Sequence, residues 1–144
     1  MARSGTGIRH RAREVAFRVA YQADVTGDSF AAAWDSRREQ EQLNDDQAAL
    51  VGDLVRALMA HADEIDGRIR AAAEHWPLER ISATDRAVMR SAIAEFTARP
   101  GTPVRVVLDE AVEIARRFGS RESGRFVNGV LDRVARTVRA AEFE

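Results

Sequence analysis

Apolar residues recur at three- and four-residue spacing along nearly the whole chain, which is the pattern of amphipathic helices. No stretch alternates in the way that a half-buried strand does. The spacing predicts six helices, at about residues 9–24, 29–40, 45–73, 84–98, 104–118 and 120–138. The sequence therefore predicts an all-α protein of six or seven helices, built as two small bundles that share one core.

Local signals support these bounds. Ser82 and Asp85 have capping-box spacing, with Asp in place of the usual Glu. Thr102 is placed as an N-cap, with Pro103 at the first helical position after it. Gly119 follows an apolar stripe and is expected to end that helix. On the first helix the expected core face is Ala12, Val15, Ala16, Val19 and Ala23.

The last helix contains an unexpected pair. The stretch "RFVNGVLDRV" has helical apolar spacing but carries Asn128 and Gly129 in its interior, together about 1–1.5 kcal/mol less favourable than two alanines. We expect Gly129 to permit close approach of another helix, with the first helix of the chain as the candidate, and Asn128 to hydrogen-bond across the contact. Such a crossing would bring the start of the chain beside Phe126.

Length and composition indicate one domain over residues 1–144, with residues 1–8 as a flexible basic tail. There are no cysteines, so no disulfide or thiolate metal site is expected. No apolar run has the length of a signal peptide or of a membrane span, so the expected compartment is the cytoplasm and no membrane partner is expected.

Charge is segregated along the chain although the net charge is only −1. Residues 1–23 carry five arginines and one glutamate, residues 24–66 carry three arginines and eleven acids, and residues 67–144 carry fourteen arginines and eleven acids. All 22 basic residues are arginine, a side chain that can form two hydrogen bonds to one phosphate or stack on a base. This distribution indicates a region that faces a polyanion.

Signals for catalysis are missing. His10, His61 and His75 lack metal-ligand spacing, and no phosphate-binding loop or nucleophile elbow occurs. The acids Asp109, Glu110 and Glu113 lie near Arg116 and Arg117 and are expected to form a solvated, paired helix face. We therefore expect no enzyme, no cofactor and no metal.

Two groups of residues are candidates for binding a nucleic acid. Arg9, His10, Arg11 and Arg13 would ring the start of the first helix, an arrangement that suits a single strand better than a duplex groove. Arg125 and Phe126 stand at the mouth of the last helix, where an aromatic ring could stack on an unpaired base. The alternatives are a merely solubilising terminus and a Phe126 that only closes the core.

The segment "FGSRESGRFVNGVLDRV" resembles a pattern of the NusB family of transcription antitermination factors, Phe-Gly, three residues, Ser, two residues, Phe-Val-Asn-Gly-Val-Leu-Asp. The segments "TPVRVVLDEAVEIARRFG", "WPLERISATDRAVMRSAIAEF" and "RHRAREVAFRVAYQAD" are similar to further helices of that family. The resemblance covers residues 9–24 and 76–134, whereas residues 25–75 match only in length and helical character.

The resemblance implies a NusB-like fold of two three-helix bundles and no catalysis. It implies binding of the boxA element of ribosomal RNA leader transcripts, jointly with the ribosomal protein NusE, within the antitermination complex of RNA polymerase. Carried over by position, it assigns RNA contact to the basic segment and Phe126. Glu122 falls at an acidic position near that surface, and Asp85 at one that faces NusE, with Arg86 and Arg90 as weaker candidates.

Some positions depart from the family pattern. His10 replaces an arginine, and Gly124 stands where a bulkier polar residue is common. Family members differ in oligomeric state, which leaves monomer and homodimer open. Two other readings also remain open: the NusB-like domain of a ribosomal RNA cytosine methyltransferase, which would require a catalytic domain beyond residue 144, and a helical interaction protein with no nucleic-acid role.

Overall fold

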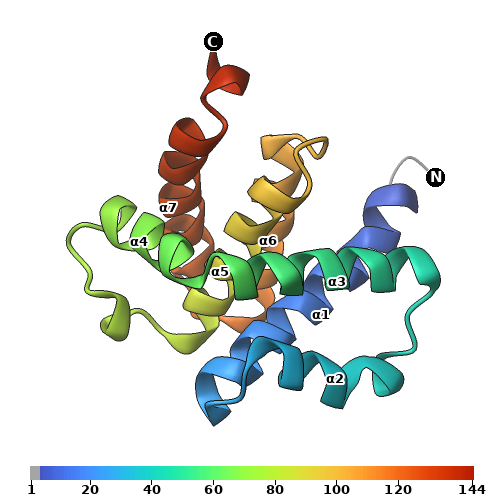
Figure 1. The fold of residues 1–144 in the computed structure, drawn as a ribbon. Coiled ribbons are helices and arrows are strands. Elements are labelled where there is room, and N and C mark those ends of the chain that lie inside the picture. Colours follow the sequence, from blue (N-terminus) through green and yellow to red (C-terminus); the bar gives the residue numbers. More distant parts are fainter. Residues whose placement is uncertain (1–3) are drawn as a thin grey trace.

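The computed structural model describes the backbone of residues 4–144 and the side chains from residue 7 onward. The described residues form seven α-helices and two short 3-10 turns, with no strand among them (Figure 1). In order they are α1 (Ser4–Thr26), α2 (Phe30–Glu41), α3 (Asp45–Ala60), α4 (Ala62–Ala72), η1 (Leu78–Arg80), α5 (Ala83–Ala98), α6 (Val104–Phe118), α7 (Ser123–Val138) and η2 (Ala140–Phe143). The predicted all-α fold is confirmed.

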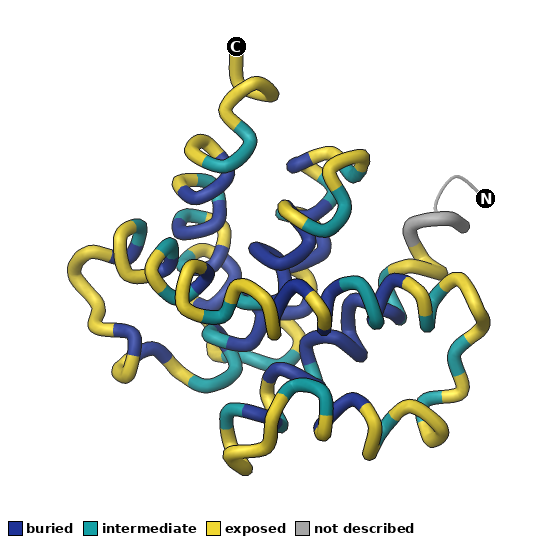
Figure 2. The backbone as a smooth tube through the Cα atoms, in the orientation of Figure 1, coloured by how far each residue is buried: buried dark blue, intermediate teal, exposed yellow. Residues whose placement is uncertain are grey.

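Two apolar cores underlie this arrangement. The first joins α1, α2 and α3, and its α1 residues are the five predicted from the spacing. The second is formed by α4 to α7 together with one side of α1 and α3, through side chains such as Phe17 and Leu58. α5 packs on α1, α3, α6 and α7, so it lies between the two bundles. Figure 2 shows the buried backbone concentrated where these helices cross.

Some boundaries differ from the prediction. The helix predicted for residues 45–73 is two helices, because His61 leaves helical geometry (φ −127°, ψ 26°) between α3 and α4. α1 is helical from Ser4, so the tail expected to be flexible is helix over residues 4–8, and residues 1–3 lie outside the described part. α6 begins at Val104 with Pro103, not Thr102, at the N-cap position. No helix of the described part is long and apolar enough to cross a membrane.

Helix caps explain several starts. Asn44 accepts a hydrogen bond from the Gln47 amide while the Gln47 side chain accepts one from the Asn44 amide, a complete capping box that opens α3. Ser82 Oγ accepts from the Asp85 amide at 3.1 Å, which gives the serine half of the predicted box at α5. Capping of this kind contributes about 1 kcal/mol per helix start.

The expectation for Asn128 and Gly129 is wrong. A Cβ at Gly129 would meet only the end of the Arg133 side chain, at 3.9 Å, and Asn128 is exposed. The close approaches lie earlier in the chain. A Cβ at Gly124 would lie 3.0 Å from Arg116 Cγ, and one at Gly119 would lie 2.4 Å from Ser123 Oγ. The tight α6–α7 turn therefore depends on Gly119, because Ser123 Oγ accepts from the Ser120 amide there.

We predict that Gly119→Ala destabilises the protein by about 1–3 kcal/mol, because the added methyl collides with Ser123 Oγ and the Ala115 carbonyl. Gly129→Ala is the matched control in the same region. It should stabilise by up to about 1 kcal/mol, since alanine is the better helix former and space is available. Urea denaturation measures both changes, and equal effects of the two substitutions would contradict the assignment.

Candidate functional site

The start of α1 presents its basic side chains in three different environments. Arg9 is exposed and lines a cleft with Arg99 and residues 101–103. The side chains of His10 and Arg11 are 19% and 42% exposed. Arg13 is only 6% exposed. The predicted ring of cations around the helix end is therefore wrong for Arg13, because this position belongs to the helix face that packs on the protein interior.

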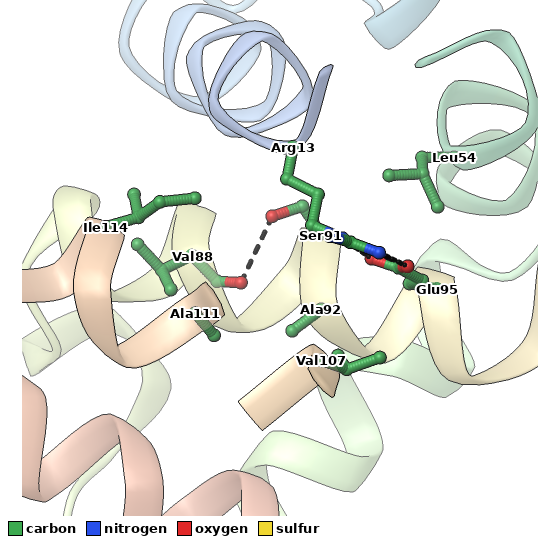
Figure 3. Close-up of a pocket in the computed structure, with 9 residues that line it drawn as sticks. All are labelled: Arg13, Leu54, Val88, Ser91, Ala92, Glu95, Val107, Ala111 and Ile114. Atoms are coloured by element: carbon green, nitrogen blue, oxygen red, sulfur yellow. Dashed lines mark hydrogen bonds and ion pairs between the residues drawn. The ribbon is translucent and has the colours of Figure 1, made fainter. Parts of the chain in front are cut away.

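Arg13 forms a buried ion-pair network. Its Nε and Nη2 donate to Glu95 Oε1 and Oε2 at 2.9 and 2.8 Å, and its Nη1 donates to Glu110 Oε1 at 2.9 Å. Glu95 and Glu110 are 2% and 3% exposed. Burial alone lowers the pKa of Arg13, but the hydrogen bonds and charges of Glu95 and Glu110 outweigh it and hold the pKa above its ordinary value. Figure 3 shows the side chain reaching from α1 to Glu95 among apolar neighbours.

Acidic side chains also engage His10 and Arg11. His10 Nδ1 lies 3.0 Å from Glu110 Oε2. Arg11 Nη2 donates to Glu41 Oε1 at 2.8 Å and to the Glu41 carbonyl at 3.1 Å, which ties α1 to the end of α2. The expectation of a solvated acidic face on α6 is wrong for Glu110, which is buried against α1. The positive charge at the start of α1 is thus partly balanced within the fold.

At the mouth of α7, Glu122 and Arg125 are exposed and Phe126 is half-buried against the second core. Arg125 lines an open groove with Asn128 and the α6 residues Asp109, Glu113 and Arg116. The N-cap residue of α7 is Glu122, whose side chain makes no capping hydrogen bond. Phe126 therefore packs on the core and remains partly accessible, and its stacking on a base stays a prediction.

The two candidate groups lie on either side of α6. α1 and α7 both pack on this helix, and Figure 1 shows α6 between α7 and the first half of α1. Glu113 lines the groove with Arg125, and one of its carboxylate oxygens also lies within 4.8 Å of a His10 ring nitrogen. The basic segment and Phe126 are therefore not direct neighbours, contrary to the expectation. They lie at two ends of a surface that extends across α6.

A further cationic and aromatic surface was missed by the sequence analysis. The guanidinium carbons of Arg18 and Arg117 lie 5.2 and 5.0 Å from the centre of the Phe118 ring, and Phe118 stacks at 5.3 Å on Phe17. Tyr21 is 39% exposed and lines a groove with Arg18, Phe118 and Thr84. We call Arg18, Tyr21, Arg117 and Phe118 the aromatic–arginine surface. In the sequence, only the aromatic Tyr21 on the first helix pointed to this surface. The contact of Arg18 with Phe118 could not be predicted, because the two residues are about a hundred positions apart.

The candidates on α5 divide into two kinds. Asp85 is 8% exposed, and its Oδ1 is buried without a hydrogen-bond partner in the described residues. Arg86 donates to Asp24 Oδ2 at 2.8 Å and to the carbonyls of Leu78 and Ile81. Arg90 donates to Asp66 Oδ1 at 2.8 Å and Oδ2 at 3.1 Å. Arg86 and Arg90 therefore join α5 to neighbouring helices, and their contact with NusE stays a prediction.

These features are typical of one class of protein. The helical scaffold presents arginine and aromatic side chains on surfaces at the start of α1, across α6 and at the start of α7, the chemistry of a nucleic-acid-binding protein. The model of the NusB family matches residues 10–136. The chain belongs to the NusB family, a non-enzymatic class of transcription antitermination factors.

Individual relatives agree. The transcription antitermination protein NusB of Koribacter versatilis is 41% identical over 139 residues, which covers 94% of this chain and 93% of the relative. That of Solibacter usitatus is 42% identical, covering 89% and 88%. A structure of T. maritima NusB superposes with a TM-score of 0.83 at 30% identity, covering 94% and 96%. A crystal structure of the antitermination factors NusB and NusE in complex with dsRNA gives 0.80 at 26% identity, covering 90% and 97%.

We predict that Arg13→Ala destabilises the protein by about 3–5 kcal/mol, because two carboxylates that are nearly inaccessible to water lose their counter-charge. Arg9→Ala, four residues earlier on the same helix but exposed, should change the free energy of unfolding by no more than about 0.5 kcal/mol. Chemical denaturation followed by circular dichroism measures both values. A small effect of Arg13→Ala would show that the buried network contributes little.

Proposed function

We propose that the protein is a transcription antitermination factor that binds the boxA element of ribosomal RNA leader transcripts together with NusE. The single observation that carries the proposal is the match of the NusB family model to residues 10–136. Exposed arginines on both sides of α6, together with the exposed Tyr21 and the half-buried Phe126, support it. A related NusB is known in complex with NusE and RNA. Acting on nascent transcripts with RNA polymerase would place the protein in the cytoplasm.

We assign the RNA contacts according to exposure. Arg9 and Arg125 are exposed and suit phosphate oxygens, and Arg11 retains exposed donors beside its bond to Glu41. Phe126 and the aromatic–arginine surface offer ring faces for unpaired bases. Glu122 is exposed next to this region and would repel phosphate, which limits affinity. Arg13 and His10 contribute indirectly, because both interact with Glu110 and so hold α1 against α6.

The NusE contact is assigned to Asp85. A buried carboxylate oxygen without a donor is energetically unfavourable, and a hydrogen-bond donor from a partner would satisfy it once neighbouring side chains move aside. Its neighbour Thr84 lines the same groove as Tyr21, so the partner and the RNA would occupy adjoining surfaces. Arg86 and Arg90 would support this contact by fixing α5 rather than by touching NusE.

We predict that Arg9→Ala weakens binding of single-stranded boxA RNA and reduces the slope of log affinity against log salt by about 0.7, the value for one lost phosphate contact on a single strand. Phe126→Ala should cost about 1–3 kcal/mol of binding through lost stacking, with a smaller change in stability because the ring is only half-buried. Fluorescence anisotropy over a salt series measures both effects.

Arg136→Ala is the control for this titration, since Arg136 is 60% exposed near the opposite end of α7 and pairs with Asp132. It should leave RNA binding unchanged. A duplex competitor tests the preference for single strands. Self-association over the start of α1 would compete with RNA, so sedimentation should accompany the measurement. Equal losses in all three variants, or none, would contradict the assigned surface.

We predict that Asp85→Asn lowers NusE affinity roughly tenfold, which corresponds to about 1.4 kcal/mol and to loss of a charge-assisted hydrogen bond. The amide has the same shape as the carboxylate, so the fold should be retained. Glu79→Gln, an exposed acid in the preceding turn, is the matched control and should bind NusE normally. Isothermal titration with NusE measures both, and unaltered affinity in Asp85→Asn would rule out this contact.

A further inference from the structure

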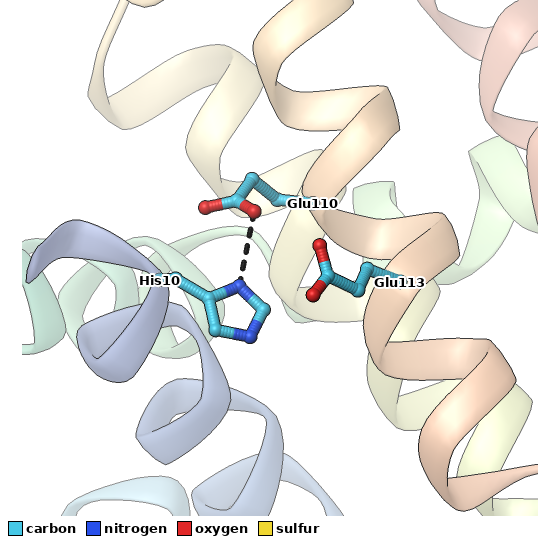
Figure 4. Close-up of side chains that lie close together, drawn as sticks. All are labelled: His10, Glu110 and Glu113. Carbon is cyan, nitrogen blue, oxygen red and sulfur yellow. Dashed lines mark hydrogen bonds and ion pairs between the residues drawn. The ribbon is translucent and has the colours of Figure 1, made fainter. Parts of the chain in front are cut away.

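Three potential metal ligands far apart in the sequence meet where α1 crosses α6. His10 comes from α1, while Glu110 and Glu113 stand one turn apart on the same face of α6. One nitrogen or oxygen from each of the three side chains lies within 4.8 Å of the others. Figure 4 shows both carboxylates turned toward the edge of the same imidazole ring. The sequence analysis expected no metal site, because His10, His61 and His75 lack metal-ligand spacing.

We propose that His10, Glu110 and Glu113 form a binding site for a divalent transition-metal ion of the Zn²⁺ type. One imidazole with two carboxylates is a donor set that such ions accept, with water completing the coordination. Ligands about 2.0–2.2 Å from an ion lie about 3.0–3.5 Å from one another. His10 Nδ1 and Glu110 Oε2 are already 3.0 Å apart, and Glu113, with an oxygen within 4.8 Å, would become the third ligand by exchanging its present contact for the ion.

The surroundings of the site orient its ligands. Arg13 Nη1 bonds to Glu110 Oε1 and thereby leaves Oε2 directed at His10. The charge of Arg13 is shared with Glu95, to which Nε and Nη2 donate, so it only partly offsets the negative charge of Glu110. A divalent cation is therefore electrostatically compatible with the cluster.

The second nitrogen of His10 supplies an independent observation. Nε2 is buried and has no hydrogen-bond partner, and the nearest carboxylate oxygen given by an ion pair is Glu14 Oε1 at 4.0 Å. When Nδ1 binds a metal ion, the imidazole proton resides on Nε2 and faces Glu14. A metal-binding histidine usually donates its outer N–H to a carboxylate, and Glu14 stands on that side of the ring, although 4.0 Å is too long for a hydrogen bond. Glu14 is itself fixed by Arg18 and Arg117 at 3.1 and 2.8 Å.

The test is a calorimetric titration of the metal-free full chain with Zn²⁺, with Co²⁺ absorption as the spectroscopic readout. We expect one saturable equivalent. Glu113→Gln should weaken binding roughly tenfold or more. Asp109→Asn is the matched control, since it is an exposed acid on α6 next to Glu110. It should bind as the parent does, and so should a variant with both His61→Ala and His75→Ala.

A shift of the His10 imidazole resonances on addition of Zn²⁺ would locate the ion directly. Loss of binding in Glu113→Gln with retention in the controls supports the site. Absence of saturable binding, unchanged affinity in Glu113→Gln, or loss only in the variant lacking His61 and His75 would overturn it. Because Glu113 is exposed, this substitution tests the proposal even where His10→Gln disturbs folding.

Discussion

The buried guanidinium of Arg13 is the interaction on which the rest of the arrangement depends. It joins α1 in the first bundle to Glu95 on α5 and Glu110 on α6. Burying these charges costs several kcal/mol per ion, so the network is expected to contribute more to a defined orientation of α1 than to net stability. All three guanidinium nitrogens are engaged, which fixes the rotation of α1 about its axis. That rotation decides which of the basic residues face solvent.

The surface proposed for RNA binding follows from this orientation. With Arg13 turned inward, Arg9 and part of Arg11 face outward, and Glu14 is drawn between Arg18 and Arg117. The same packing places Phe118 under those two arginines and leaves Tyr21 exposed beside it. Acids on α2 and α6 balance much of the positive charge at the start of α1. An RNA-binding protein built in this way would have modest affinity alone and gain from a partner that adds contacts.

Weak helix formers have different roles from those that the sequence suggested. Gly119 and Gly124 allow the close α6–α7 packing, while Asn128 and Gly129 have no contact that requires them within the described residues. Helix propensity locates the weak positions, but it cannot show which of them a neighbouring helix approaches. Asp85 shows the same limit: its capping position was evident, whereas its buried and unpartnered oxygen was not.

The sequence by itself determined the helices, most of their ends, the core face of α1 and, through the resemblance, the family, because periodicity, caps and motifs are local properties. It also located Arg125 and Phe126 at the start of a helix, whereas the helix that carries Arg9 begins earlier, at Ser4. Only the tertiary structure decided that Arg13 and Glu110 are buried partners, that Arg86 and Arg90 are internal ties, and that His10 meets two glutamates. Each of these depends on contacts between residues 24 to 103 positions apart, and a pairing at that distance leaves no periodic trace in one sequence.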